Sequence, residues 1–453
     1  MRNRLVKSEF ARNVATLMTG TVIAQIIPLL FTPILTRLFS PEEFGVFAFF
    51  MSVIIFLSVL GAGRFEQAIV LPKEDHEAIN VLALSFGILT SFVAVLFAVV
   101  LLFYDAIVDV LGVPSLRSWL WFVPICVFLT VSYRILTFWS NRNKRFKGTS
   151  SAYIGQATSR AATQITGGVL KHGVTHEFSG LSNFFIRIFD KGHVVTNGIT
   201  KIGVGSLILS WGTGFFIGSL ILFFPLFKRD RKLITKISKR EMKAQARIFK
   251  KFPLINAWHA LGDELKNVGV NAAILYGFGG VILGYYSITF RILRAPLGVI
   301  GSSFGQVFYQ KAAEMHANGN DILPLVKNTT KKLLIIAVPI FTILIIFGPD
   351  IFQFVLGEKW RVAGVYAQYL APWIMFGFIV SPIQQVGIIK NRQEQMLLFS
   401  ILGNVIIFGS ILIGAYWFED ILQGFLLLSV LQSIYLCWVY IWILRIAQKA
   451  PAR

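Results

Sequence analysis

Twelve stretches of roughly 16 to 25 mostly apolar residues recur along this chain of 453 residues. A hydrocarbon core about 30 Å thick is spanned by about 20 helical residues, which matches the length of these stretches. An unpaired backbone group costs several kcal/mol in hydrocarbon, so stretches this long and this apolar should be α-helices. The sequence therefore predicts an all-α polytopic membrane protein with twelve transmembrane helices.

A basic connector after the sixth stretch divides the predicted spans into two sets of six. We expect an N-lobe at residues 1–226, a cytoplasmic connector at 227–252 and a C-lobe at 253–453. Six spans return the chain to the same side, so a repeat of the two halves would be parallel, about an axis along the membrane normal. The halves also begin alike, with Gly45-Val46-Phe47 in one and Gly284-Tyr285-Tyr286 in the other. Two pseudo-symmetric six-helix lobes around a central cavity are typical of a transporter. The predicted spans are residues 14–36, 44–62, 79–103, 119–139, 152–170, 201–225, 254–276, 280–300, 330–349, 365–387, 396–417 and 422–444.

The charge of the chain is strongly positive, with 43 Lys and Arg against 22 Asp and Glu. In a soluble protein such an excess would suggest nucleic acid, but here most basic residues fall in inner segments if the N-terminus is cytoplasmic. This bias is the positive-inside pattern, so we expect both termini in the cytoplasm, contact with anionic lipids and no nucleic-acid partner. The connector Lys228–Lys251 sets dense basic residues around sparse apolar ones such as Leu233 and Met242. This spacing favours an amphipathic helix on the inner leaflet, with a solvated linker as the alternative.

Signs of catalysis or cofactor binding are weak. Ser40-Pro41-Glu42-Glu43 has the spacing of a helix start, with Ser40 as N-cap and Glu43 closing a capping box, rather than that of an acidic catalytic loop. No phosphate-binding GxxxxGK[ST] sequence occurs. The outer segment 171–201 holds His176, Glu177 and His193, but nothing else there shapes a metal site. We expect a transporter rather than an enzyme, with no cofactor and no metal.

Arg134 and Arg160 are predicted to lie inside the membrane, in the fourth and fifth spans. Each is 13 residues from position 147, the centre of the loop that joins the two spans, so we expect them at one depth. Neither span contains an acidic residue. Two such arginines predict an anion-binding site, because the guanidinium fork matches phosphate oxygens. The alternative is that each extends to the inner headgroups.

A second group of intramembrane charges falls in the seventh and eighth spans, which should form a hairpin about position 278. The hairpin would bring the residues of the seventh span level with those of the eighth. Internal neutralisation is the favoured interpretation, because a paired charge is cheaper in low dielectric than a lone one. The functional alternative makes one of the carboxyls a protonatable coupling site. The group consists of Asp263, Glu264 and Lys266 in the seventh span and Arg291 and Arg294 in the eighth.

The intramembrane charges sum to a positive value, so the lumen should attract anions. Arg64 lies at the cytoplasmic end of the second span, where it could guide an anionic headgroup inward. Simple inside-positive anchoring explains Arg64 equally well.

Several segments resemble the bacterial polysaccharide biosynthesis proteins, which are O-antigen and exopolysaccharide flippases. The resemblance implies the multidrug/oligosaccharidyl-lipid/polysaccharide exporter fold, in which two six-helix lobes form a V and alternate access. It also implies an undecaprenyl-diphosphate-linked oligosaccharide as cargo. The segments that carry it are Phe10–Val14, Leu35–Gly45, Arg64–Pro72, Asn141–Phe146, Gly284–Arg291 and Val307–Tyr309.

The leading hypothesis is a flippase that moves this lipid-linked oligosaccharide from the inner to the outer leaflet of the bacterial cytoplasmic membrane for surface polysaccharide or lipopolysaccharide synthesis. Arg134, Arg160, Arg64, Arg291 and Arg294 are the expected substrate-binding residues, and other polysaccharide assembly proteins are expected partners. A drug or cation antiporter of the same superfamily is one alternative. A membrane glycan polymerase or ligase is another, although it should carry a large outer catalytic loop.

Overall fold

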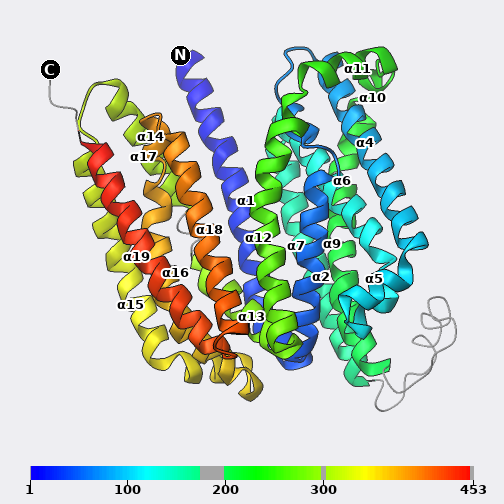
Figure 1. Cartoon of the computed structure of the whole chain (residues 1–453). Coiled ribbons are helices and arrows are strands. Elements are labelled where there is room, and N and C mark those ends of the chain that lie inside the picture. The colour runs from blue at the N-terminus through cyan, green and yellow to red at the C-terminus, as the bar shows by residue number, and fades with distance from the viewer. Residues whose placement is uncertain (1, 174–197, 297–301, 449–453) are drawn as a thin grey trace. The chain divides into compact units, whose positions relative to one another are not determined.

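The computed structural model describes residues 2–173, 198–296 and 302–448, and this part of the chain is helical without any strand (Figure 1). The predicted all-α class is confirmed. Nine helices in the described residues are long and apolar enough to cross a membrane, so the chain is a multi-pass membrane protein. Eight of them coincide with, or lie within, a single helix, and the ninth, Glu358–Ile389, contains the helix Arg361–Ile383. The helices are α1 (Arg2–Leu38), α2 (Pro41–Leu60), α4 (Asp75–Leu102), α6 (Phe122–Arg142), α9 (Gly198–Arg229), α15 (Leu323–Leu356), α16 (Arg361–Ile383), α18 (Gln393–Tyr416) and α19 (Ile421–Ala447).

The other three predicted spans also fall on helices, but these are more polar. They are α7 (Phe146–Gly173), α12 (Ala257–Phe278) and α13 (Gly280–Pro296). Polar helices at membrane depth pack against protein or line water, because lipid does not satisfy their side chains. The shorter helices are α3 (Phe65–Ala68), α5 (Tyr104–Leu111), α10 (Arg231–Ile234), α11 (Lys239–Ile248), α14 (Ser302–Ala317) and α17 (Val386–Ile389), with short 3₁₀ helices at Pro114–Trp119 and Glu358–Trp360 and a π-helical turn at Phe252–Asn256.

Local sequence chemistry sets the start of α2. The Ser40 backbone N–H donates to Glu43 Oε2 at 2.7 Å, and the Glu43 N–H donates to Ser40 Oγ at 3.3 Å. This reciprocal pair is the capping box that the sequence predicts. The acidic residues here therefore end a turn and begin a helix.

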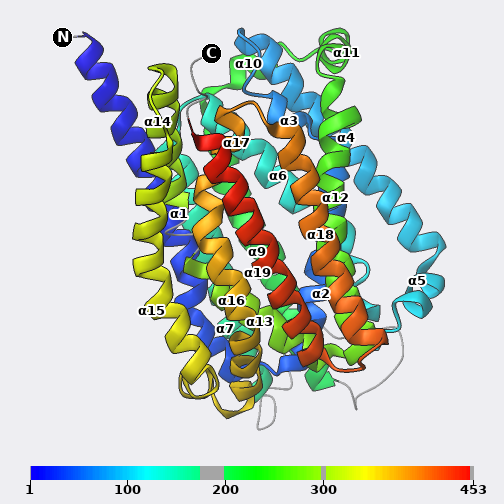
Figure 2. The same cartoon turned by 60° about the vertical axis from the view of Figure 1, so that its left-hand side comes forward.

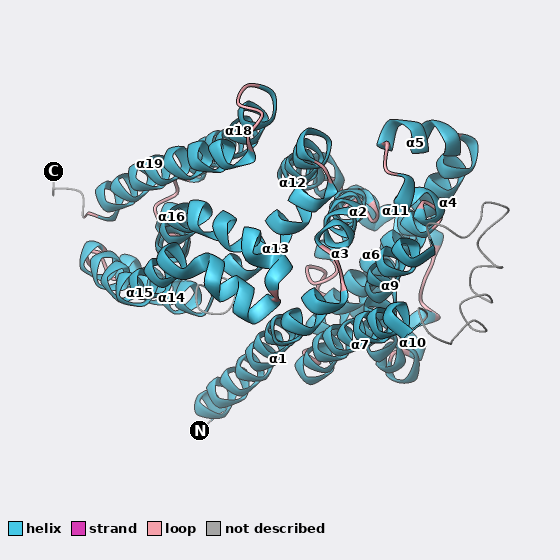
Figure 3. Cartoon of the chain, turned by 90° about the horizontal axis from the view of Figure 1, so that it is seen from below, coloured by secondary structure: helices cyan, strands magenta, loops and turns pink. Residues whose placement is uncertain are grey.

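The helices form two compact units. Unit 1 comprises Met1–Phe39 and Val46–Val268, and unit 2 comprises Ser40–Gly45 and Gly269–Arg453. In unit 1, α7 packs against both α1 and α9, and α4 packs against α6. In unit 2, α16 contacts α13, α15 and α19, and α18 packs on α19 (Figures 2 and 3). The expected lobes at 1–226 and 253–453 stay a prediction.

Glycines let two helix starts approach closely in unit 2. A Cβ added at Gly45 of α2 would collide with the carbonyl oxygen of Gly280 in α13, and one added at Gly284 would collide with the carbonyl oxygen of Pro41. The contact is reciprocal, because each glycine meets the residue four positions before the other. Small residues at such crossings allow backbones to pack without a hydrophobic driving force. Gly45 and Gly284, which begin the two similar segments, thus meet in one crossing.

We predict that Gly284→Ala destabilises the protein by about 1–3 kcal/mol, because the new methyl group overpacks this crossing. Gly409→Ala in α18 is the matched control, since nothing lies within 4 Å of a Cβ at Gly409. There the gain in helix propensity should leave stability equal or slightly higher. Thermal unfolding of the two detergent-solubilised variants measures the difference, and an equal effect would contradict the account.

Candidate functional site

The candidate site in unit 1 begins at a sharp turn between α2 and α4. Gly63 and Arg64 both have positive φ, 56° and 62°. This conformation is strained for arginine by about 1–3 kcal/mol. The turn starts α3 and directs the Glu66 side chain inward, where it is 1% exposed. Arg64 Nε and Glu66 Oε2 are both buried and lack a hydrogen-bond partner in the described part of the chain.

Arg134 of α6 reaches this turn. Its NH1 lies 3.4 Å from Glu66 Oε1, and its NH2 donates to the Ser58 carbonyl oxygen at 3.3 Å. The expectation that Arg134 lacks a counter-ion is therefore wrong. The carboxylate comes from α3 rather than from the neighbouring span, and Glu66 was not among the site residues expected from the sequence. The pair is long and single-pronged, unlike a bidentate arginine–carboxylate pair.

Two further charges act on the Arg134 guanidinium, those of Arg64 and Glu264. Glu264 lies on the part of α12 that belongs to unit 1, where its Oε2 also accepts from Asn267 Nδ2 at 2.9 Å. The site thus combines two cations and two carboxylates. It joins residues that the sequence placed in separate groups.

Arg160 lies near the middle of α7, half-buried against aromatic rings. Its Cζ is 4.4 Å from the ring centroid of Trp211 in α9 and 5.8 Å from that of Phe47 in α2. A guanidinium over a tryptophan face is attracted by the ring quadrupole, more strongly where water is excluded. Arg160 is therefore held near the middle of α7 by aromatic faces.

The expectation that Arg134 and Arg160 share one depth is wrong. The turn between α6 and α7 is short, because Lys144 adopts a left-handed φ of 53° and the Arg145 N–H bonds back to the Ser140 carbonyl. The ring of Tyr133, beside Arg134, meets that of Tyr153 at 6.2 Å between centroids. Arg160 lies about seven residues beyond Tyr153, or roughly 10 Å further along α7 at ~1.5 Å per residue.

A row of three aromatic rings, two on α9 and Tyr133 on α6, connects the level of Arg160 with that of Arg134. Trp211 contacts Phe215 at 4.8 Å between centroids, and Phe215 contacts Tyr133 at 5.2 Å. The indole N–H of Trp211 donates to Thr130 Oγ1 at 3.0 Å. The intervening Gly214 lets α7 approach, since its Cβ would lie 3.2 Å from Arg160 Cβ. The spacing of two aromatics at i, i+4 with a glycine between them is the signal that sequence reasoning missed.

Two arginines of the segment 141–146 have structural roles. Arg145 forms a two-pronged pair with Asp230, at 2.6 and 2.8 Å, and the Trp139 indole donates to the same carboxylate at 2.9 Å. Arg142 donates to the Pro72 carbonyl at 2.7 Å and to Asp75 Oδ1 at 3.0 Å. These bonds fix the ends of α6 and α9 and the segment after α3, and so position the candidate site.

The remaining expected site residues lie on α12 and α13. Arg294 is exposed, with its Cζ 4.3 Å from the ring centroid of Phe290, and Arg291 is half-buried. Asp263 and Lys266 are half-buried in unit 1. The expected pairing of these four residues spans the two units and stays a prediction. His176, Glu177 and His193 lie outside the described residues.

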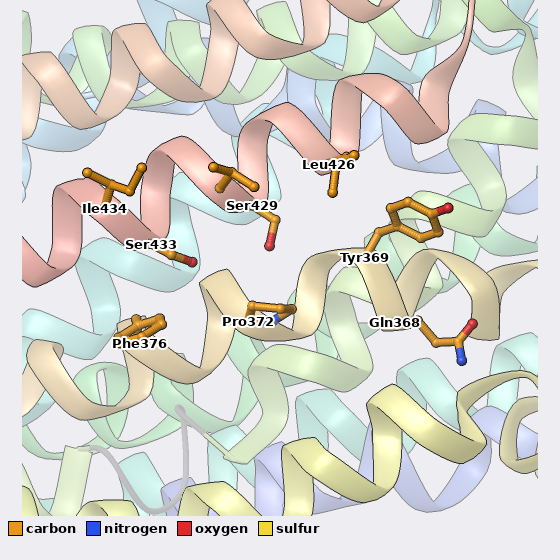
Figure 4. A pocket seen from close by; sticks show the side chains of 9 residues that line it. Gln368, Tyr369, Pro372, Phe376, Leu426, Ser429, Ser433 and Ile434 are labelled. Atoms are coloured by element: carbon orange, nitrogen blue, oxygen red, sulfur yellow. The ribbon is translucent and has the colours of Figure 1, made fainter.

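Unit 2 contains an apolar groove of about 470 Å³ between α16 and α19. The Ser429 and Ser433 side chains point from α19 toward α16 (Figure 4). Ser429 Oγ already accepts from the Trp373 backbone N–H at 3.4 Å. The groove has no charged group, so it offers nothing for an anionic head. It is lined by Gln368, Tyr369, Pro372, Phe376, Leu426, Ser429, Val430, Ser433 and Ile434.

We predict that Asp230→Asn lowers the free energy of unfolding by about 3–5 kcal/mol, because it leaves the Arg145 charge without its buried partner. Asp350→Asn is the matched control. Its partner Arg361 lies 2.6 Å away, but both side chains are at least half exposed, so the loss should be about 0–1 kcal/mol. Denaturant unfolding in mild detergent would measure both, and similar losses would refute the structural role of Asp230.

The chain resembles solved membrane transporters over nearly its whole length. An inward-facing multidrug resistance MATE family transporter of the MOP superfamily is 15% identical, with a TM-score of 0.63 and coverage of 95% of this chain and 94% of that chain. A MOP superfamily transporter from Pyrococcus furiosus is 14% identical, with a TM-score of 0.54 and coverage of 96% and 95%. A variant of a Vibrio cholerae MATE transporter is 13% identical, with a TM-score of 0.56 and coverage of 97% of both chains. The fold is therefore that of the MOP superfamily transporters.

Comparison of the sequence with family models is more specific. A search of curated protein sequences finds no match. Two family models, both described as polysaccharide biosynthesis protein, match residues 10–163 and 194–364. Together these matches cover more than half of the chain and include α3, Arg134, Arg160 and Glu264. The chain therefore belongs to the polysaccharide biosynthesis protein family.

Proposed function

We propose that this protein flips an undecaprenyl-diphosphate-linked oligosaccharide from the inner to the outer leaflet of the bacterial cytoplasmic membrane. The product would serve O-antigen, lipopolysaccharide or exopolysaccharide synthesis. Both termini would then be cytoplasmic, and other polysaccharide assembly proteins would supply and consume the cargo. Family membership and the transporter fold support the class of activity. The chemistry of unit 1 supports the choice of cargo.

The observation that carries the proposal is Arg160 in the middle of α7, held between aromatic rings of α2 and α9. Moving a diphosphate across bare hydrocarbon is prohibitively unfavourable, because each charge would lose its hydration. A guanidinium at that position supplies hydrogen-bond donors and positive potential to phosphate oxygens. Phe47 and Trp211 hold Arg160 in place and add flat apolar faces beside it. The polar helix α7 would line this path.

Arg134 would act as an exchangeable partner rather than as a lone anion site. Its contact with Glu66 is a single one at 3.4 Å, and Glu66 Oε2 has no hydrogen-bond partner in the described structure. A diphosphate could replace this weak contact with a two-pronged one, while Glu66 turns to Arg64. The head would therefore meet Arg64 and Arg134 first and Arg160 about 10 Å further along α7.

A drug or cation antiporter is the second candidate, because multidrug transporters share the fold. The positive intramembrane charge disfavours a cationic cargo. The Pyrococcus furiosus transporter is described as having a binding pocket of reverse polarity, which suggests a different function for that protein. Pocket charge is thus a property that varies within this fold.

We predict that Arg160→Gln lowers the rate of flipping at least about tenfold, equivalent to a loss of ~1.4 kcal/mol of stabilisation. Arg117→Gln is the matched control, because Arg117 also lies over an aromatic ring, that of Tyr104 at 6.0 Å, but is exposed. The assay is accumulation of lipid-linked glycan on the inner leaflet of a null strain that expresses each variant at equal levels. Normal flipping by Arg160→Gln would remove the proposed role.

We further predict that Glu264→Gln weakens the dependence of flipping on a pH gradient, because the amide cannot exchange a proton beside Arg134. Asp263→Asn tests the adjacent carboxyl, and Glu394→Gln, at the exposed start of α18, is the control. Transport by proteoliposomes with and without an imposed gradient measures the dependence. Unchanged dependence in both α12 variants would exclude these carboxyls as coupling sites.

A further inference from the structure

The basic connector is docked onto α4 in unit 1 rather than running free. Asn80 of α4 is fully buried and bonds to it twice, donating to the Lys236 carbonyl at 3.2 Å and accepting from the Ser238 N–H at 2.9 Å. Ser238 then caps α11, with its Oγ accepting from the Glu241 N–H at 3.2 Å. Gln245 on α11 is buried as well. α11 is therefore fixed beside α4 (Figures 1 and 2).

An apolar groove of about 510 Å³ lies where α11 meets α4. This volume is in the ~300–1,000 Å³ range of small-ligand sites. One face of α4 supplies its floor, and Met242 of α11 bounds it. Gly87 faces Met242, since a Cβ there would lie in ordinary contact with Met242 Cε at 3.8 Å, and the Ser91 hydroxyl donates to the Gly87 carbonyl at 3.0 Å. It is lined by Leu84, Gly87, Ile88, Ser91, Phe92, Val95 and Met242.

A strip of positive charge runs along α11, the helix that carries Met242. Lys239, Lys243 and Arg247 recur at i, i+4 and i+8 on α11, so they share one face, next to that of Met242. All three are exposed, and none joins an ion pair among the described residues. Ile248, which ends α11, and Trp258, ten residues later, expose 64% and 69% of their surface. Basic side chains beside exposed apolar ones are typical of a helix at a membrane surface.

We propose that α4 and α11 form a binding site for an anionic phospholipid of the surrounding membrane. The acyl chain lies in the groove along α4, and Lys239, Lys243 and Arg247 hold the phosphate of the headgroup. An anionic phospholipid fits because Met242, which bounds the apolar groove, lies on the same short helix as the three cations. The site is separate from Arg134 and Arg160 and does not depend on the proposed cargo.

The test uses the full-length protein in nanodiscs of phosphatidylcholine with one third phosphatidylglycerol. Spin-labelled lipid of either class reports how many acyl chains the protein immobilises. We expect the wild type to prefer phosphatidylglycerol, and the combined Lys239→Gln, Lys243→Gln and Arg247→Gln variant to lose this preference by at least about fivefold. A fivefold loss corresponds to ~1 kcal/mol, the contribution of a single basic residue near a lipid surface, and is therefore a lower bound for three.

Two matched controls separate a built site from general basicity. Lys311→Gln, Lys331→Gln and Lys332→Gln remove the same charge from unit 2 and should leave the preference intact. Ser91→Phe fills the groove and should reduce immobilised chains of both lipids, whereas Ala98→Phe, on the same helix but outside the groove, should not.

Three results would overturn the proposal. The first is an equal loss of preference in the two charge variants. The second is no effect of Ser91→Phe on immobilised chains. The third is displacement of phosphatidylglycerol by an equimolar prenyl diphosphate, which would assign the groove to cargo instead. The flipping assay of Arg160→Gln tests only the proposed function and not the phospholipid site. Failure of the one proposal is therefore distinguishable from failure of the other.

Discussion

The structure depends on how guanidinium groups are accommodated within membrane helices, where a charge at the bilayer centre costs at least ~2.5–3.5 kcal/mol on insertion scales. Unit 1 solves this problem in three ways. At the turn between α6 and α7, Arg145 is neutralised by a two-pronged, largely buried pair with Asp230. Arg134 has a weaker, single contact with Glu66. Arg160 lies against the faces of Trp211 and Phe47. The first arrangement stabilises the fold, and the second is weak enough for an anionic cargo to replace it.

The packing of unit 1 places these groups. Gly214 and Gly218 on α9 allow close approach of α7 and of the Tyr133 ring, so the row of three aromatic rings runs directly from Arg160 to the neighbour of Arg134. The strained turn at Gly63 and Arg64 aims Glu66 at Arg134. Backbone strain persists only where surrounding structure over-determines it, and here the Arg142 bonds to the segment after α3 supply that support. Local strain, close glycine packing and charge placement thus form one arrangement.

Much of the fold follows from local sequence. Twenty-residue apolar runs predict spans because the bilayer leaves the backbone no other solution, and Ser40 with Glu43 predicts the start of α2. The charge pairing was not predictable in this way. Glu66 and Arg134 are 68 positions apart, and no spacing rule connects them. The prediction that Arg134 and Arg160 lie at equal depth was wrong because the turn between their helices is centred near Lys144 rather than on position 147. Trp211 was missed because an aromatic in an apolar run usually indicates core packing.

The central claim is that the arginines of unit 1 receive an anionic head inside the membrane. A cryo-EM map of the protein in nanodiscs with an undecaprenyl-diphosphate-linked oligosaccharide tests it most directly. The account predicts diphosphate density within about 3 Å of the Arg134 or Arg160 guanidinium, in the space beside Phe47 and Trp211. Cargo density elsewhere, with Arg134 still bonded to Glu66 and Arg160 facing acyl chains, would contradict it.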